Sequence, residues 1–178
     1  MPFLRLICVA LFFAMPLGCG RSGSPRPDSQ SLKIVKNATR VEVFRVYSGG
    51  APGTKKMPKF IGDLSISGFP VWAQGKDQGH DFASRLADVL SDKDSYSDSF
   101  AKCFDPGVAF RAWQGERCVD VVICFQCDNL YVGPPKKDQG ENYSFIKTPA
   151  RARLIVLTKE AFPEDNEVQS LKEASQWN

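Results

Sequence analysis

The stretch that decides the fold reads Cys103-Phe-Asp-Pro-Gly-Val-Ala-Phe-Arg-Ala-Trp-Gln-Gly-Glu-Arg-Cys118-Val-Asp-Val-Val-Ile-Cys124-Phe-Gln-Cys127. Two runs rich in β-branched and aromatic residues, 108–113 and 118–125, flank a short polar link that contains Gly115. Glycine accepts the positive φ that tight hairpin turns require, so this pattern predicts a β-hairpin. We place the loop at Gly115-Glu116, because the alternative loop at Gln114-Gly115 loses the pairing of Arg111 with Asp120.

This register predicts what lies on each face of the hairpin. One face is apolar and pairs Phe110 with Val121, Val108 with Ile123, and Ala112 with Val119. On the other face Trp113 lies opposite Cys118, and Arg111 lies opposite Asp120. Cross-strand pairs of this kind stabilise sheets, so we expect Arg111 and Asp120 to form a structural ion pair.

The same register sorts the cysteines of the hairpin. Cys118 lies at the turn, and Cys124 follows six residues later, about 20 Å along the strand. Gly107 falls opposite Cys124, so Cys103, Cys124 and Cys127 should gather at the end far from the turn. Because a disulfide needs Cα atoms within about 7 Å, we predict that Cys103 pairs with Cys124 or, preferably, Cys127. Cys118 should then stay an unpaired, mostly buried thiol.

Composition places the chain among ordinary globular proteins. It has 178 residues, of which 43% are hydrophobic and 24% charged, both typical of a folded domain. The net charge of +3 is too small to indicate nucleic-acid binding. After the N-terminal segment, no stretch is long and apolar enough to span a membrane.

The N-terminus predicts export and a lipid anchor. An apolar run, 6–17, follows Arg5, as in a signal peptide. The sequence Leu17-Gly18-Cys19-Gly20 then resembles the bacterial lipobox, in which the chain is cut before a cysteine that carries lipid, although Pro16 and Leu17 replace the usual Leu and small residue. We therefore interpret 1–18 as a lipoprotein-type signal peptide and Cys19 as the lipid attachment site. The alternative is an ordinary secreted protein cut nearby.

The remaining chain divides into a tether and one domain. Residues 19–31 are rich in Gly, Ser, Pro and Arg, a linker composition, and 32–178 form the domain. We expect a membrane-anchored lipoprotein of the bacterial cell envelope that faces the periplasm or the cell exterior. Its partners would be the membrane, through the anchor, and an envelope protein or ligand.

Hydrophobic patterning outside the hairpin predicts further elements. We expect strands or extended segments at 39–47, 60–69, 70–74, 129–132 and 152–157, a helix opening at 78–81 and continuing through Leu90, and a terminal helix at 164–176. In total we predict about five strands and two helices. The helices do not alternate with the strands, which favours an α+β fold with a mainly antiparallel sheet.

The cysteines also carry the chemical alternatives. Thiol-redox motifs place the first cysteine of a CxxC at a helix N-terminus, which lowers its pKa, but no helical sequence follows Cys127. A structural disulfide is therefore favoured in an exported protein. The alternative cofactor is zinc, held by Cys103, Cys124, Cys127 and His80 as a Cys₃His site. His80, however, is remote in sequence.

Other motifs exclude several classes of site. The acidic segment 92–98 fails the EF-hand pattern, because Ser97 replaces its glycine and Cys103 its final glutamate. The chain has no phosphate-binding loop and no nucleophile elbow. The sequence therefore favours a non-catalytic domain over an enzyme.

Three segments resemble a family of uncharacterised bacterial exported proteins and lipoproteins. They are Gly75-Lys-Asp-Gln-Gly79, Cys103-Phe-Asp-Pro-Gly-Val-Ala-Phe-Arg111 and Val119-Asp-Val-Val-Ile-Cys-Phe-Gln-Cys-Asp-Asn-Leu130. The resemblance implies an exported domain and brings no known activity. Our leading hypothesis is a membrane-tethered, non-catalytic binding or structural domain. The alternative is a thiol-redox or zinc site at Cys103, Cys124 and Cys127.

Overall fold

The computed structural model describes residues 25–49, 57–98, 103–139 and 143–174. Within these ranges, eight strands form one sheet in the order β2-β3-β1-β5-β6-β7-β8-β4. Every pair of neighbouring strands is antiparallel. The predicted α+β class with an antiparallel sheet is confirmed. The predicted counts of about five strands and two helices are wrong, because the described residues form eight strands and four α-helices.

The elements have the following bounds. The strands are β1 (Arg40–Val46), β2 (Ser65–Ile66), β3 (Phe69–Gln74), β4 (Tyr96–Ser97), β5 (Val108–Gln114), β6 (Arg117–Cys124), β7 (Asn129–Gly133) and β8 (Ser144–Ile146). The helices are α1 (Ser29–Lys36), α2 (His80–Ser91), α3 (Thr148–Ala161) and α4 (Asn166–Gln169), with a short 3₁₀ helix, η1 (Lys93–Ser95), between α2 and β4.

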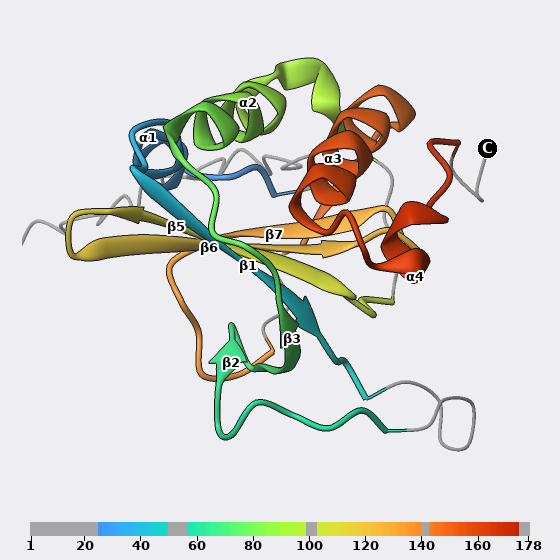
Figure 1. Ribbon diagram of the computed structural model, residues 1–178. Coiled ribbons are helices and arrows are strands. Elements are labelled where there is room, and N and C mark those ends of the chain that lie inside the picture. Colours follow the sequence, from blue (N-terminus) through green and yellow to red (C-terminus); the bar gives the residue numbers. More distant parts are fainter. Residues whose placement is uncertain (1–24, 50–56, 99–102, 140–142, 175–178) are drawn as a thin grey trace, which may run out of the picture.

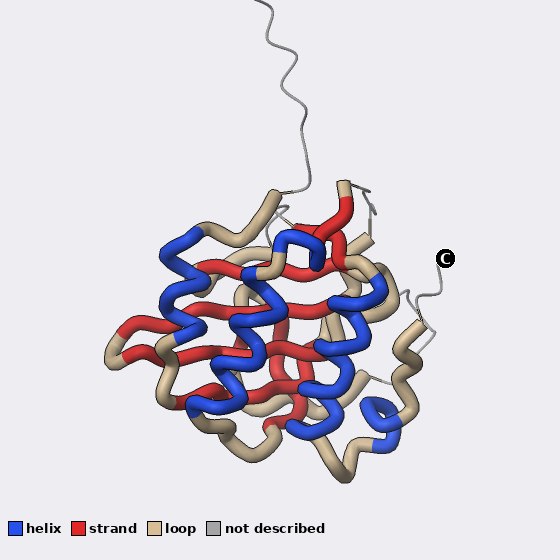
Figure 2. Tube along the Cα trace, turned by 90° about the horizontal axis from the view of Figure 1, so that it is seen from above, coloured by secondary structure: helices blue, strands red, loops and turns tan. Residues whose placement is uncertain are grey.

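Helices α1, α2 and α3 cover one face of the sheet (Figures 1 and 2). The main core lies between them and the strands, and Phe110 is its largest fully buried side chain. The Phe110 ring meets that of Phe82 of α2 edge-on, with centroids 5.4 Å apart. Burying an aromatic side chain of this size stabilises the fold by about 2–3 kcal/mol, so this contact joins α2 firmly to the middle of the sheet.

The opposite face of the sheet carries a second, smaller core. In Figure 1, β2 and the start of β3 lie below the other strands of the sheet, and the segment after β7 loops beneath those strands. The buried apolar residues there are Phe44, Val46, Ile66, Phe69, Val71, Ala109, Val122 and Tyr131. The sheet is therefore covered on both faces, by helices on one side and by a strand–loop layer on the other.

The central hairpin has the register that the sequence predicts. Phe110 pairs with Val121, Arg111 with Asp120 and Trp113 with Cys118. Gly115 occupies the turn with φ +60°, the conformation for which glycine is favoured. β1 flanks β5 on its other side, so the hairpin lies in the middle of the sheet.

The strand predicted at 152–157 is wrong, because this segment belongs to α3. Its buried residues Ala150, Leu154, Leu157 and Ala161 recur at helical spacing, whereas Val156 is 53% exposed. A short apolar run does not by itself distinguish a strand from a buried helix. The proline at the start of α3 is the local signal that favours a helix.

Other predicted elements are shorter than expected. Of the extended segment 60–69, only β2 and the first residue of β3 pair as strands. The terminal helix predicted at 164–176 is reduced to α4, and its last two positions lie outside the described residues. The helix predicted to run through Leu90 is confirmed as α2, with Asp81 in its first turn.

The sequence prediction missed α1, which begins inside the segment assigned to the tether. Asp28 caps it, because one carboxylate oxygen accepts hydrogen bonds from the backbone N–H groups of Gln30 and Ser31, each at 2.9 Å. Asp28, followed by Leu32 and Val35 at helical spacing, is a sequence signal for the start of a helix. The folded domain therefore begins upstream of Leu32. None of the described helices is long and apolar enough to cross a membrane.

Gly75 offers a test of this packing. A Cβ at this position would lie 2.7 Å from Val43 Cγ2 and 2.8 Å from the backbone oxygen of Ala161. We expect Gly75→Ala to lower the free energy of unfolding by about 1–3 kcal/mol, as overpacking does, measured by urea denaturation. Gly107→Ala is the matched control, since a Cβ there meets no atom within 4 Å, and should cost under about 0.5 kcal/mol. Equal costs in the two variants would contradict the packing.

Candidate functional site

Three cysteines gather at the end of the hairpin far from its turn, as predicted. Cys103 Sγ lies 2.7 Å from Cys127 Sγ, and the backbone N–H of Cys127 donates to Cys124 Sγ at 3.0 Å. Asn129, which pairs with Cys124 across the sheet, donates its side-chain N–H to the carbonyl oxygen of Cys103 at 2.9 Å. We call Cys103, Cys124 and Cys127 the thiol cluster.

A buried arginine fixes the turn that carries the thiol cluster. The Arg151 guanidinium, from α3, donates to the carbonyl oxygen of Phe125 and to the carboxylate of Asp128. It also donates to the backbone oxygen of Lys172 at 3.1 Å. The Arg151 and Asp128 side chains are 3% and 2% exposed. Removing one member of such a pair leaves a buried charge without its partner, which costs about 3–5 kcal/mol, so Arg151 ties α3 to this turn.

The thiols of the cluster are not activated for nucleophilic chemistry. Burial raises the pKa of Cys127 to about 11 and also raises the pKa of Cys124. The pKa of Cys103 is raised by its hydrogen bond to Cys127 and by burial. Because the thiolate is the reactive form, all three thiols are less reactive at neutral pH than an ordinary cysteine.

The sulfurs of Cys103 and Cys127 are in contact but not bonded. Their separation exceeds the S–S bond length of about 2.05 Å, and all four described cysteines are free thiols. Cys103 is exposed, whereas Cys127 is buried, so an oxidant would reach the pair from the side of Cys103. The arrangement can close into a disulfide with a small movement.

The histidine proposed as a zinc ligand lies at the other end of the sheet. His80 begins α2, and its Nδ1 lies 3.1 Å from the carbonyl oxygen of Ala38. The neighbouring Thr39 donates its backbone N–H to the carbonyl oxygen of Trp113, at the turn end of the hairpin. The thiol cluster is about 20 Å away along β5 and β6. His80 therefore does not join the cluster, and within the described ranges no three His, Cys, Asp or Glu residues are grouped to hold a metal ion.

Cys118 is separate from the cluster, as the register predicts. It lies opposite Trp113 near the hairpin turn. It is partly exposed rather than mostly buried, because the strand–loop layer below the sheet lies under the other half of the hairpin. Burial still raises the pKa of its thiol.

The Arg111–Asp120 ion pair forms as predicted and extends further than the sequence indicates. Asp120 accepts hydrogen bonds from Arg111 Nε at 2.7 Å and from an Arg111 terminal nitrogen at 3.0 Å. The hydroxyl of Ser67, at the β2–β3 turn, donates to the second Asp120 oxygen at 2.8 Å. Burial acts to lower the pKa of Arg111, but the hydrogen bond and the charge of Asp120 outweigh it, and the net shift is upward.

A second buried arginine was not predicted. Arg45, 4% exposed, pairs with Asp165, and its second terminal nitrogen lies 2.9 Å from Glu167. Its guanidinium also lies 4.8 Å from the centre of the Trp72 ring. The pair joins β1 to α4, more than a hundred residues apart, and strand alternation around Arg45 gives no sign of this partner.

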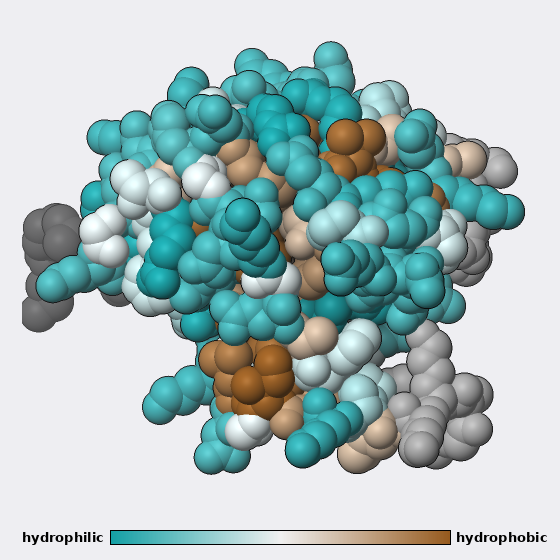
Figure 3. All heavy atoms as spheres, viewed as in Figure 1, coloured by the Kyte–Doolittle hydropathy of each residue, from teal (hydrophilic) through white to brown (hydrophobic). Residues whose placement is uncertain are grey.

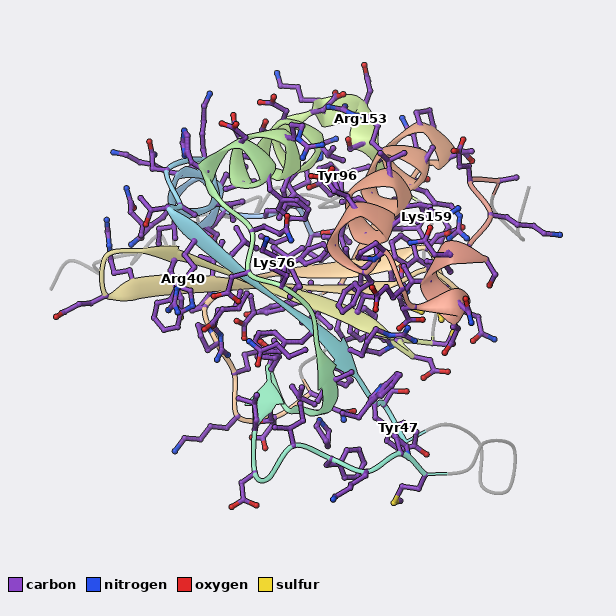
Figure 4. All side chains as sticks on the ribbon, viewed as in Figure 1. Arg40, Tyr47, Lys76, Tyr96, Arg153 and Lys159 are labelled. Carbon is purple, nitrogen blue, oxygen red and sulfur yellow. The ribbon has the colours of Figure 1, made fainter. Side chains whose placement is uncertain are left out.

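A polar hollow of about 630 Å³ lies beside β4. We call it the β4 hollow; its lining residues are Arg26, Lys93, Asp94, Tyr96, Ser97, Asp98 and Lys147. Tyr96 is labelled in Figure 4, between α2 and α3. Sequence reasoning missed this site because its residues come from three separate segments, none of which is strongly basic alone.

No protein-family model, no curated protein and no solved structure matches the chain. Cys19, the predicted lipid attachment site, lies outside the described residues.

The thiol cluster predicts one disulfide under oxidising conditions. In an oxidising compartment we expect a Cys103–Cys127 bond, with Cys118 free. It closes a loop across 24 positions and should stabilise the fold by about 3 kcal/mol in the chain-entropy model. Non-reducing peptide mapping checks the pairing, and thermal unfolding with and without reductant checks the stability.

Cys118→Ser is the matched control for this prediction. It should leave both the map and the effect of reductant unchanged, whereas Cys127→Ser should abolish the effect of reductant. A Cys103–Cys118 or Cys118–Cys124 bridge would contradict the pairing.

Proposed function

We propose that this protein is a bacterial envelope lipoprotein whose domain is a non-catalytic binding or structural module. The lipid on Cys19 would anchor the chain to a membrane, and the domain would face the periplasm or the cell exterior. Its partner would be an envelope protein or ligand that the domain meets at the membrane surface.

The observation that carries this proposal is how soon the folded domain begins after Cys19. The Ser144 hydroxyl already donates to the carbonyl oxygen of Pro25, and Asp28 caps α1. Six residues lead from Cys19 to Pro25, which span at most about 20 Å when fully extended. A lipid on Cys19 would therefore hold the domain close to the membrane, which suits a module that acts there.

The chemistry of the described residues supports a non-catalytic domain. The buried charged side chains Arg45, Asp120, Asp128 and Arg151 are engaged in ion pairs that join elements of the fold. The raised pKa values of the cysteines keep their thiols protonated near neutral pH. These groups contribute stability, and perturbed groups of this kind occur in structural ion-pair networks as well as in active sites.

A second candidate function rests on the gathering of Cys103, Cys124 and Cys127. As described, the three sulfurs do not form a metal-binding group. They could bind zinc if they moved together and a fourth ligand came from water or a partner, or they could exchange disulfides with another protein. Zinc bound in a stable ratio to the purified protein, or a fast-reacting thiol, would favour this candidate. A Cys103–Cys127 disulfide without metal favours the structural role.

Lipid labelling tests the leading proposal. We expect a palmitate analogue fed to a bacterial host to label the full chain, and the mature protein to begin at Cys19. Cys19→Ser should abolish the label, because the lipid is attached to that sulfur. Cys118→Ser, which removes a partly exposed thiol of the domain, should keep it. An unlabelled wild-type protein that begins at another residue would refute the anchor.

A further inference from the structure

The β4 hollow lies where the chain enters the domain. Arg26, which lines it, directly follows Pro25, whose carbonyl oxygen accepts the hydrogen bond from Ser144 of β8. β4 pairs with β8 and is the edge strand of the sheet on that side. The segment that would lead to the lipid anchor therefore leaves the domain beside this hollow.

The length of that segment limits how far the hollow can lie from a membrane. Arg26 follows Cys19 by seven positions, at most about 25 Å of extended chain. This step rests on the lipid anchor of the proposed function. With the anchor in place, the edge of the sheet that carries β4 is the part of the described domain held nearest to the headgroups.

The charged side chains of the hollow suit an anionic ligand. Arg26, Lys93 and Lys147 are cationic and Asp94 and Asp98 anionic, which leaves one net positive charge. The three cationic side chains are exposed. They form no ion pair or side-chain hydrogen bond with another residue in the described ranges, so their donors are available to a phosphate group.

The start of α3 adds to this positive field. Lys147 is the residue that precedes the helix, and its side chain caps no backbone group. The N-terminus of a 14-residue helix carries a partial positive charge from its unpaired N–H groups. The positive charge of Lys147 and the positive N-terminal end of α3 therefore lie on the same side of the hollow.

A rival contact surface lies at the opposite edge of the sheet. Met57 and Ile61 are 67% and 42% exposed, and Figure 3 shows an apolar patch below the sheet near β2. Lys59 lies between them in sequence. Nothing in the described residues shows what covers this patch, and the chain does not enter the domain there, so we use it as the comparison site.

From these observations we propose that the β4 hollow binds the phosphate headgroup of an anionic lipid in the membrane that anchors the chain. Lys93 and Lys147 contact the phosphate from two sides, and Arg26 holds the entering chain over it. The anchor and this contact together would orient the domain, with the β2–β3 edge directed away from the bilayer.

Vesicle binding by the unlipidated protein tests this site. The full mature chain carrying Cys19→Ser is mixed with phosphatidylcholine vesicles that contain or lack phosphatidylglycerol, and binding is measured by cosedimentation. We expect binding only to vesicles with phosphatidylglycerol. Each basic residue near a membrane surface changes the affinity about fivefold, so Lys93→Gln with Lys147→Gln should weaken binding about 25-fold. Lys93→Arg with Lys147→Arg should retain it.

The matched control removes the same charge from the other edge. The control variant carries Lys59→Gln and Lys76→Gln. Lys59 precedes β2 and Lys76 follows β3, and Figure 4 shows Lys76 in front of the sheet, away from Tyr96. This variant should bind nearly as well as the wild type. An equal or larger loss in the control, or wild-type binding to neutral vesicles, overturns the proposal.

A competition experiment distinguishes a lipid headgroup from a soluble phosphate compound as the ligand of the hollow. Displacement from the vesicles by inorganic phosphate, but not by chloride at the same ionic strength, would assign the hollow to a soluble phosphate compound and overturn the lipid assignment. The test uses no lipid on Cys19. If the wild-type chain takes up no palmitate label but the Cys19→Ser chain still binds vesicles through its lysines, only the anchor is refuted. If the wild-type chain is labelled but the Cys19→Ser chain shows no lysine-dependent vesicle binding, only the headgroup site is refuted.

Discussion

The buried carboxylate of Asp120 is the group on which the layered arrangement depends. It lies in the central strand β6, is fully buried, and accepts hydrogen bonds from both Arg111 and Ser67. A carboxylate taken out of water costs several kcal/mol unless its partners are well placed. Asp120 therefore requires the hairpin register that brings Arg111 opposite it and the β2–β3 turn that brings Ser67 beneath it.

The same interaction ties together segments that are distant in sequence. Ser67 has φ +46° and also accepts a hydrogen bond from the backbone N–H of Lys136. The neighbouring Gly68 packs so tightly on the backbone of Asp138 and Gln139 that a Cβ there would lie 2.8 Å from it. The turn, the segment after β7 and the hairpin thus meet around one carboxylate, which closes the second face of the sheet.

The sequence predicts those parts of the fold whose signals are local. The hairpin register follows from alternation and one glycine, and the grouping of the thiol cluster follows from that register. By contrast, the apolar run 152–157 fits a strand or a buried helix equally well, and only its packing against the sheet decides for α3. Strands of two or three residues, such as β2, β4 and β8, are too short to show alternation. Their existence depends on partners elsewhere in the chain.

The functional features follow the same division. Cys103, Cys124 and Cys127 are visible in sequence because one hairpin brings them together. The partners of Arg45 and Arg151, and the lining of the β4 hollow, depend on tertiary contacts between segments that no local pattern connects. His80 shows that residue type alone can mislead, because a histidine suits zinc but the fold places this one at the other end of the sheet from the thiol cluster.

A double-mutant cycle between Arg111 and Asp120 tests the central role of this carboxylate most directly. The free energy of unfolding is measured for Arg111→Met, Asp120→Asn, the double variant and the wild type. Arg111→Met should cost about 3–5 kcal/mol, because it leaves the buried carboxylate without its ion-pair partner. The two residues should be coupled by about 1–3 kcal/mol. If the losses of unfolding free energy in the two single variants add up to the loss in the double variant to within about 0.5 kcal/mol, the two residues are not coupled and the account is contradicted.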